Sequence, residues 1–247
     1  MVSKIFLGRI FKGIFSEWKM VKTKKKDLPV ISEDKTVKRN DFIELQFTGY
    51  ANGEVFDSNV PEELKKINPE AKVQKTVIVI GEKMVVAGLD KDLEGKEIGK
   101  KYEVEIKKKD AFGDRKRELI RTIPLNAFKE KDAQPRVGMV LTFDNAMARI
   151  IAISGARVIA DFNNPLSGKD LKYVYTIVRK VDDDKEKAEA LFENYLRFVP
   201  EIEVKEKVIA KGPKELEPVI KQLNDKFKDL IGKELSFSEK KGEAKSQ

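Results

Sequence analysis

The chain has 247 residues, of which 40% are hydrophobic and 37% are charged, and it contains no His and no Cys. These absences exclude disulfides, thiol nucleophiles, Cys/His zinc sites and imidazole bases, so any chemistry must use carboxylates, amines, hydroxyls or the shape of a pocket. The length predicts about one to two globular domains. A chain without Cys is consistent with a cytoplasmic location, which we expect for this protein.

The net charge of +8 is concentrated at the start of the chain. Residues 1–26 contain eight Lys and Arg against one Glu, which gives this segment +7 and leaves +1 for the other 221 residues. Because the remaining body is nearly neutral, we expect no nucleic acid among its partners.

The same leader has the periodicity of a basic amphipathic helix over residues 4–19. Phe11, Ile14 and Trp18 fall on one half of such a helix, and Lys12 lies opposite. Charges interrupt the pattern too often for a spanning helix or a signal peptide, so the segment could at most lie on a membrane surface. Two other interpretations stay open: a helix that docks on this protein or on a partner, and a disordered leader with the chain starting at Met20.

Between residues 35 and 113, apolar periodicity predicts four strands and one helix. Asn52-Gly53 is a hairpin signal between the first two strands, and Gly95 ends the helix. The polar stretch with Pro61 and Pro69 predicts a long loop with one helical turn. The expected strands are residues 41–50, 54–57, 76–80 and 100–107, and the expected helix is residues 83–94.

The second half of the chain predicts a small β unit, a long strand and an α-β-α-β segment. Asp182 to Asp184 is a natural helix cap before that segment, and Gly232 ends its second helix. The polar residues from Lys240 predict a disordered tail. The expected strands are residues 119–123, 137–143, 146–153, 157–161, 171–181, 202–210 and 235–237, and the expected helices are residues 188–199 and 213–231.

Cofactor and metal motifs are missing from the sequence. The closest candidate for a phosphate-binding loop, residues 95–101, has the wrong spacing and lacks the Ser or Thr that such a loop needs. Adjacent carboxylates such as Asp182 to Asp184 are more typical of a helix cap than of a cation site. We therefore expect no cofactor and no metal.

One reaction requires none of the missing groups, and this is rotation about an Xaa-Pro amide bond. Its barrier of ~18–20 kcal/mol comes from amide resonance. Water stabilises the planar, polar ground state better than the twisted one. A dry aromatic pocket that grips the proline ring therefore lowers the barrier without proton transfer.

Four motifs resemble, in order and spacing, the signature of the FKBP-type peptidyl-prolyl cis-trans isomerases. They are Phe47-Thr-Gly49, Val55-Phe-Asp-Ser58, residues 80–89 (IGEKMVVAGL) and Asp110-Ala-Phe-Gly113. The resemblance implies isomerase activity and a proline pocket at the matching positions. These are Phe47, Phe56, Asp57, Val85, Val86, Leu89, Phe112 and, on the late strand, Tyr173.

The resemblance also implies a role for each pocket residue. Phe47, Phe56 and Tyr173 would form walls and Leu89 the floor. The backbone near Val85 and Val86 would anchor the ligand, and Asp57 would orient the pocket or polarise the substrate amide. Val85, Val86 and Leu89 would look the same in an ordinary helix-on-sheet core.

The sequence departs from the common family pattern at three pocket positions. Leu89 stands where many members carry Trp, and Phe47 and Phe112 stand where Tyr is frequent. The missing hydroxyl at Phe112 removes a donor for a ligand carbonyl, so we do not expect tight binding of the family's macrolide inhibitors. Catalysis by desolvation does not depend on that hydroxyl.

The β unit interrupts the isomerase fold and resembles the insert-in-flap domain of SlyD-like and long archaeal members. In those relatives the insert holds unfolded chains, which implies client binding by its apolar residues. About half of these apolar residues must form the ordinary hydrophobic core of the insert and are then not free to bind a client. SlyD-type proteins often end in a metal-binding His-rich tail, which this chain cannot have. The candidate client-binding residues are Met139, Leu141, Phe143, Met147 and Ile150.

The predicted fold class is α+β, with an antiparallel half-barrel wrapped on a short helix, an inserted β domain and a C-terminal α/β domain that resembles the extra domain of long archaeal members. The predicted divisions are a leader and linker (1–34), an isomerase domain (35–113 with 166–181), an insert-in-flap chaperone domain (114–165), a C-terminal domain (182–239) and a tail (240–247).

We expect a monomeric isomerase that accelerates proline-limited folding of unfolded or nascent polypeptides with Xaa-Pro bonds, held by the insert. Two alternatives stay open. One is a holdase chaperone with little isomerase activity. The other is a membrane-associated scaffold that uses the leader helix of residues 4–19.

Overall fold

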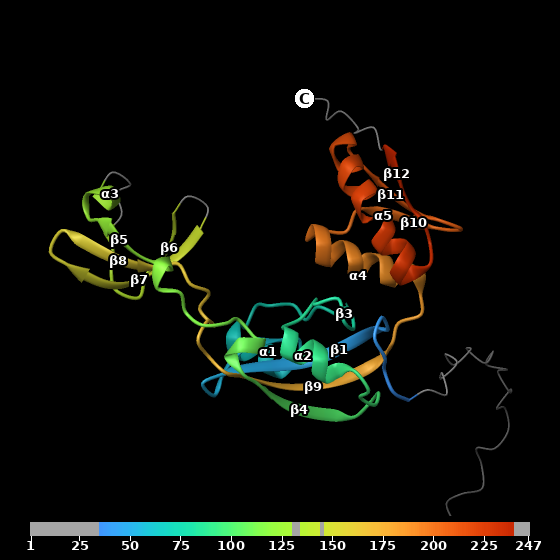
Figure 1. Cartoon of the computed structure of the whole chain (residues 1–247), viewed down its shortest axis with the longest axis horizontal. Coiled ribbons are helices and arrows are strands. Elements are labelled where there is room, and N and C mark those ends of the chain that lie inside the picture. Colours follow the sequence, from blue (N-terminus) through green and yellow to red (C-terminus); the bar gives the residue numbers. More distant parts are fainter. Residues whose placement is uncertain (1–34, 130–133, 144–145, 240–247) are drawn as a thin grey trace, which may run out of the picture. The chain divides into compact units, whose positions relative to one another are not determined.

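The computed structural model describes residues 35–129, 134–143 and 146–239 of the chain (Figure 1). The predicted leader and tail lie outside these residues. The described part contains five α-helices, twelve strands and three sheets, which confirms the α+β class. Within it, no helix has both the length and the apolar composition needed to cross a membrane.

The first sheet is antiparallel and is built around β1 (Phe42–Ala51). On one edge β1 pairs with β9 (Leu171–Lys180), which in turn pairs with β4 (Lys101–Ile106). On its other edge β1 pairs with β2 (Glu54–Ser58) through its second half and with β3 (Thr76–Val79) through its first half. The predicted turn at Asn52-Gly53 is confirmed, since both residues have positive φ, as a tight hairpin requires.

One face of this sheet forms the first hydrophobic core. Alternate residues of β9, from Leu171 to Ile177, are buried there, as their period-two pattern predicts. Leu89 and Leu93 of α2 (Ala87–Leu93) complete the core against the sheet. The half-barrel wrapped on a short helix is therefore present.

Two predictions in this region need correction. The helix expected over residues 83–94 begins at Ala87, because Lys83 has a left-handed φ of 55° and residues 81–86 form an irregular turn. The region expected to be a loop with one helical turn contains α1 (Pro61–Ile67), whose first residue is a proline, the residue best suited to that position.

The second sheet has the strand order β5 (Ile120–Pro124), β8 (Arg157–Asp161), β7 (Ala146–Ser154) and β6 (Val140–Phe143), all antiparallel. A short helix that the sequence did not predict, α3 (Asn126–Lys129), places Phe128 against Ile150 and Val158 in a small core.

The two ends of this insertion meet at its base. The Gly168 N–H donates to the Gly113 carbonyl at 2.7 Å, and the Asn163 side chain bonds both backbone groups of Lys116. The Arg115 guanidinium pairs with the buried Asp161 carboxylate. The segments that enter and leave the insertion are therefore held side by side by these hydrogen bonds and this ion pair.

The third sheet consists of β10 (Glu201–Val204), β11 (Val208–Gly212) and β12 (Leu235–Glu239). It packs with α4 (Asp184–Leu196) and α5 (Glu217–Ile231) in a second core, which also takes in Phe42, Val79 and Val181 of the first sheet region. The predicted cap of α4 is confirmed, because Asp183 accepts a hydrogen bond from the Glu186 N–H.

The prediction of one strand over residues 202–210 was wrong. These residues form a hairpin of β10 and β11, with a turn at residues 205–207. The period-two spacing of the apolar residues has the same phase on both sides of the turn, and only the charged residues 205–207 interrupt it. The segment is therefore α-β-β-α-β, and the predicted end of α5 at Gly232, with φ of 80°, is confirmed.

Candidate active site

Three aromatic rings from three different strands meet at one end of the first core. The ring of Tyr173 on β9 lies 6.1 Å from that of Phe47 on β1 and 5.8 Å from that of Phe56 on β2, centroid to centroid. The Phe56 and Tyr173 rings meet edge to face, at 88°. Such contacts fix the orientation of each ring and leave an apolar, aromatic surface.

The rings can approach because β1 carries a glycine between them. Gly49 pairs with Tyr173 on β9 and with Asp57 on β2. A Cβ atom there would lie 2.7 Å from the ring of Phe56 and 3.0 Å from that of Tyr173. The glycine is thus required by space and not by its backbone conformation.

The floor and one side of the site come from α2 and the turn before it. Leu89 is 1% exposed and belongs to the same core as Tyr173. Val85 and Val86 are partly buried and pack against this core, and Val86 is the N-cap residue of α2. The structure therefore places Leu89 in the core that contains Tyr173, and Val85 and Val86 against that core.

Asp57 supplies the charge of the site. Although it lies at the surface of β2, loss of hydration raises the pKa of its carboxyl group, and a hydrogen bond from the Ser58 N–H opposes this only in part. Burial, and then the charge of Asp57, raise the pKa of Tyr173 to about 12. The phenol therefore remains protonated, and able to donate, throughout the physiological range.

Phe112 is the candidate that does not join this group. It lies in the loop after β4, is 37% exposed and is not part of the first core. Its backbone carbonyl accepts a hydrogen bond from the Ser167 hydroxyl at 3.3 Å. The neighbouring Ala111 packs against the core in its place.

Sequence reasoning missed three residues that shape the site. Met84 and Leu166 pack against the same core. Asp90 is 7% exposed, and its carboxylate accepts hydrogen bonds from the N–H groups of Gly81 at 2.8 Å and Lys83 at 3.1 Å. The sequence did offer a signal for Asp90, because this acidic residue follows Leu89 directly on the buried side of a short predicted helix.

The five candidate client-binding residues separate into two groups. Ile150 is fully buried, and Leu141 and Phe143 pack against it. Met139 and Met147 are exposed, Met147 by 68%. Other exposed apolar residues of the insertion were not singled out from the sequence, and they are Ile120, Val137, Val140, Ile151 and Ile153.

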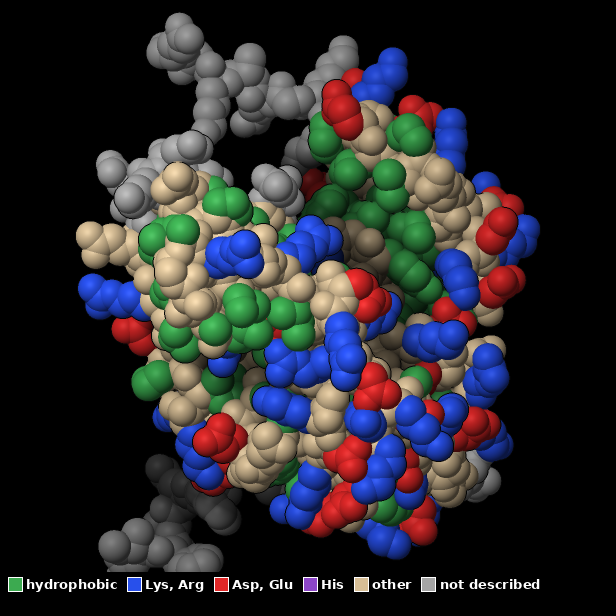
Figure 2. Space-filling view, turned by 60° about the vertical axis from the view of Figure 1, so that its left-hand side comes forward, with side chains coloured by type: hydrophobic (Ala, Val, Ile, Leu, Met, Phe, Trp, Pro, Cys, Tyr) green, Lys and Arg blue, Asp and Glu red, His purple; other side chains and the backbone are tan. Residues whose placement is uncertain are grey.

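Strand pairing shows that part of this apolar surface is shared by neighbouring strands. Val140 pairs with Arg149, and Thr142 pairs with Met147, so Val140 and Met147 lie on the same face, opposite to Leu141 and Ile150. Figure 2, in which the side of the molecule that carries the insertion is turned forward, shows hydrophobic side chains at the surface among Lys and Arg.

Comparison with known proteins agrees with this geometry. Residues 33–132 match the family described as FKBP-type peptidyl-prolyl cis-trans isomerase, and residues 121–166 match the family described as FKBP26, IF domain. The first range includes every candidate pocket residue except Tyr173.

The curated relatives carry the same description. A short-type peptidyl-prolyl cis-trans isomerase of Methanocaldococcus jannaschii is 28% identical over 145 residues, which cover 57% of this chain and 92% of the relative. The FKBP-type isomerases SlyD of Haemophilus influenzae and Escherichia coli are 31% and 29% identical over 102 residues. Those residues cover 40% of this chain and 53% and 52% of the two SlyD proteins, so the match spans about half of their length.

The antiparallel half-barrel on a short helix, with aromatic rings meeting in its core, is the structure that these matches describe in sequence. The family match and the archaeal and SlyD relatives show that this chain contains an FKBP-type peptidyl-prolyl cis-trans isomerase domain, matched over residues 33–132.

Proposed function

We propose that the aromatic site binds the proline ring of an Xaa-Pro segment, and that the second sheet holds the unfolded chain to which this segment belongs. The observation that carries the first part is the meeting of the Phe47, Phe56 and Tyr173 rings at a core that also contains Leu89. These side chains form an apolar surface on which a proline ring can lie away from water.

Removal of water explains catalysis in such a site. In the planar amide, resonance places negative charge on the carbonyl oxygen, and water stabilises that charge. An apolar site offers few donors to the oxygen, so the planar ground state loses more stabilisation than the twisted transition state. No proton has to be transferred, which agrees with a chain that has no His and no Cys.

Asp57 adds an electrostatic contribution to this proposal. A carboxylate near the substrate carbonyl disfavours the resonance form with negative charge on oxygen, and so favours rotation. Partial burial raises the pKa of the Asp57 carboxyl group, and a charge that is partly removed from water acts more strongly on its neighbours. The carboxylate thus promotes twisting of the amide without becoming a base.

The second part of the proposal rests on the exposed apolar residues of the insertion. Val140 and Met147 share one face of the sheet, and Met139 precedes β6 at its edge. Unfolded chains expose apolar side chains that such a surface can bind, and flexible Met side chains adapt to many sequences. A chain held there presents its prolines to the site at high effective concentration.

A paired measurement tests both parts. Isomerisation of a short Xaa-Pro peptide, followed without a coupled protease, should be accelerated by the parent chain and much less by Asp57→Ala. If the parent gives no acceleration and Asp57→Ala behaves identically, the enzymatic part is wrong.

Proline-limited refolding of a protein substrate tests the holding part. Val140→Ser with Met147→Ser should reduce the effect on refolding while peptide activity stays unchanged. Val219→Ser, which alters an exposed apolar residue of α5, serves as the control. Equal refolding activity of all three chains would contradict client binding by this sheet.

A further inference from the structure

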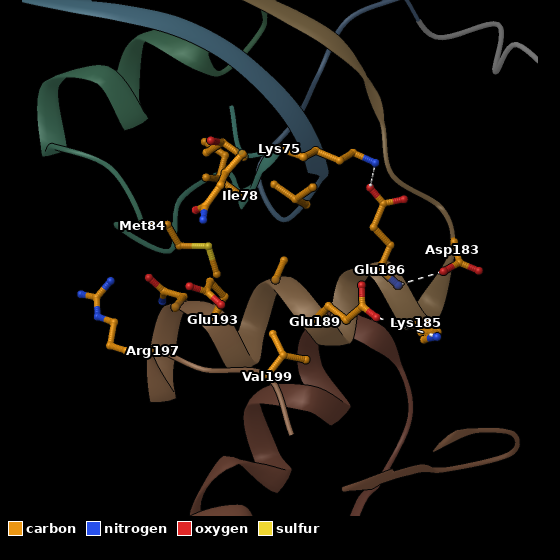
Figure 3. Close-up of a pocket in the computed structure, with 15 residues that line it drawn as sticks. Lys75, Ile78, Met84, Asp183, Lys185, Glu186, Glu189, Glu193, Arg197 and Val199 are labelled. Carbon is orange, nitrogen blue, oxygen red and sulfur yellow. Dashed lines mark hydrogen bonds and ion pairs between the residues drawn. The ribbon is translucent and has the colours of Figure 1, made fainter. Parts of the chain in front are cut away.

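The turn between β3 and α2, residues 81–86, lies between two hydrophobic cores. Val85 and Val86 pack against the core that contains Tyr173. Met84 packs against that core and also against the one formed with α4 and α5. Figure 3 shows the Met84 side chain reaching toward α4, beside a cavity of about 720 Å³. The turn that carries two pocket residues is therefore also in contact with C-terminal elements.

Glu82 connects the same turn to both C-terminal helices. Its Oε2 atom accepts hydrogen bonds from the Lys226 ammonium of α5 at 2.7 Å and from the Tyr195 hydroxyl of α4 at 3.3 Å. The Glu82 side chain is only 17% exposed, so water cannot easily replace a lost partner. Burial, and then the charge of Glu82, raise the pKa of Tyr195 and keep its hydroxyl protonated as a donor.

The backbone of the turn needs such support. Gly81 has φ of 89° and Lys83 has φ of 55°, and the left-handed conformation is unfavourable for a residue with a side chain such as Lys83. Inside the isomerase fold, Asp90 holds the N–H groups of these two residues. Glu82, which stands between them, is held from the C-terminal side. Two separate parts of the chain thus fix one turn.

We propose that the C-terminal α/β segment positions the pocket turn of the isomerase, with Glu82 as the positioning residue that connects the two. The inference rests on the proposed function, because it takes Val85 and Val86 to be part of the proline site. It gives residues 182–239 a role in catalysis: they hold the turn in the conformation that presents these valines and the adjacent backbone to the substrate.

A charge exchange in the full chain tests this proposal. Lys226→Glu places two carboxylates against each other and should loosen the turn, whereas Glu82→Lys combined with Lys226→Glu restores an opposite-charge pair. Lys221→Glu is the matched control, because it makes the same charge change on α5 at a residue that pairs with Glu217 in its own helix at 2.8 Å. Two readouts are needed: kcat/KM for an Xaa-Pro peptide, and amide hydrogen exchange of residues 81–86.

We expect Lys226→Glu to lower kcat/KM by about fivefold and to speed exchange in the turn, the size of effect typical of a partly buried ion pair. The exchanged pair should recover most of both losses, and Lys221→Glu should match the parent. Unchanged exchange in Lys226→Glu would overturn the proposal, as would faster exchange with unchanged kcat/KM. An inactive parent would contradict the proline site, and the exchange data would then still show whether the C-terminal segment holds the turn.

Discussion

The ring of Phe56 fills the space in which Gly49 has no side chain, at 2.7 Å from the position that a Cβ atom would take. Tyr173 approaches the same point from β9, at 3.0 Å. The contact of these two rings therefore depends on the absence of a side chain at Gly49, although the φ of Gly49 is not positive.

Gly49→Ala should consequently separate the rings and damage the site. Overpacking of this kind costs about 1–3 kcal/mol of stability, and we expect kcat/KM for an Xaa-Pro peptide to fall by at least about tenfold because ring geometry shapes the pocket. Gly53→Ala is the control: no atom lies within 4 Å of the added methyl group, so it should affect the hairpin backbone without changing activity per folded molecule.

Asp90 should be the side chain on which the pocket turn depends most. Asp90→Ala leaves the Gly81 and Lys83 N–H groups without their acceptors, for which we expect a loss of about 2–4 kcal/mol in the free energy of unfolding. Isomerase activity should fall as well, at temperatures where the variant is still folded. Lys91→Ala, at an exposed neighbouring position, should leave both quantities unchanged in denaturant titrations and peptide assays.

The charge of Asp57 should lower the stability of the fold at neutral pH while it supports activity, and the effect on stability should depend on pH. Burial raises the pKa of its carboxyl group above the usual 3.8, so the folded state binds a proton more tightly than the unfolded state does. The folded state is therefore favoured at low pH and loses this advantage as the pH rises through the folded pKa. Asp57→Asn should thus be more stable than the parent at neutral pH, and the difference should shrink below pH 4.

The activity of Asp57→Asn should change in the opposite direction. The variant keeps the shape of the site but lacks the charge. We therefore expect kcat/KM to fall by about tenfold. A variant that is both less stable and fully active at neutral pH would contradict this account. Thermal unfolding and peptide isomerisation across the pH range measure the two quantities.

Glu186 joins α4 to the first sheet through Lys75 and Arg179. It bonds the Arg179 guanidinium at 2.6 Å and Lys75 Nζ at 2.5 Å, and Figure 3 shows the contact with Lys75 beside the cavity. Burial alone would raise the pKa of Glu186, but these hydrogen bonds outweigh it and leave the pKa below 4.5. The resulting stability is present at neutral pH and is lost as the pH falls through the folded pKa.

Glu186→Gln should therefore unfold more readily than the parent at neutral pH, by about 1 kcal/mol for a partly exposed pair. The difference should disappear under acidic conditions, where the parent carboxylate is itself protonated. Denaturant titrations at neutral and acidic pH make the comparison. A difference that is equal at both pH values would show that the ion pairs are not its source.

Local periodicity was sufficient to predict the strands that build the site. The alternation in β9 is regular, and in β1 Leu45 and Phe47 keep the same spacing after an irregular start, so the strands that carry Phe47 and Tyr173 follow from the sequence. It was not sufficient where a side chain distant in sequence controls the backbone. Asp90 accepts a hydrogen bond from the Lys83 N–H in a turn for which the sequence predicts a helix, and no local pattern at Lys83 indicates this contact.

Local periodicity was also insufficient in the C-terminal part of the chain. The turn in the hairpin of β10 and β11 is built from Lys205, Glu206 and Lys207, and three charged residues between apolar alternations were the only signal for it. The contacts of Glu82 with Lys226 and Tyr195 join segments more than a hundred residues apart, which no local pattern predicts.

The hydrogen bond between Gly168 and Gly113 bears on how the chain closes its longest internal loop. In the chain, β4 and β9 are separated by the whole insertion, yet Ile106 pairs directly with Leu171. Closing so long a loop costs entropy, and contacts of such high sequence separation form slowly. Once the inserted sheet has formed, its joined ends reduce that loop to a few residues on either side. If the inserted sheet forms first, the pairing of β4 with β9 becomes a nearly local event, although the two strands lie on opposite sides of the insertion in the sequence.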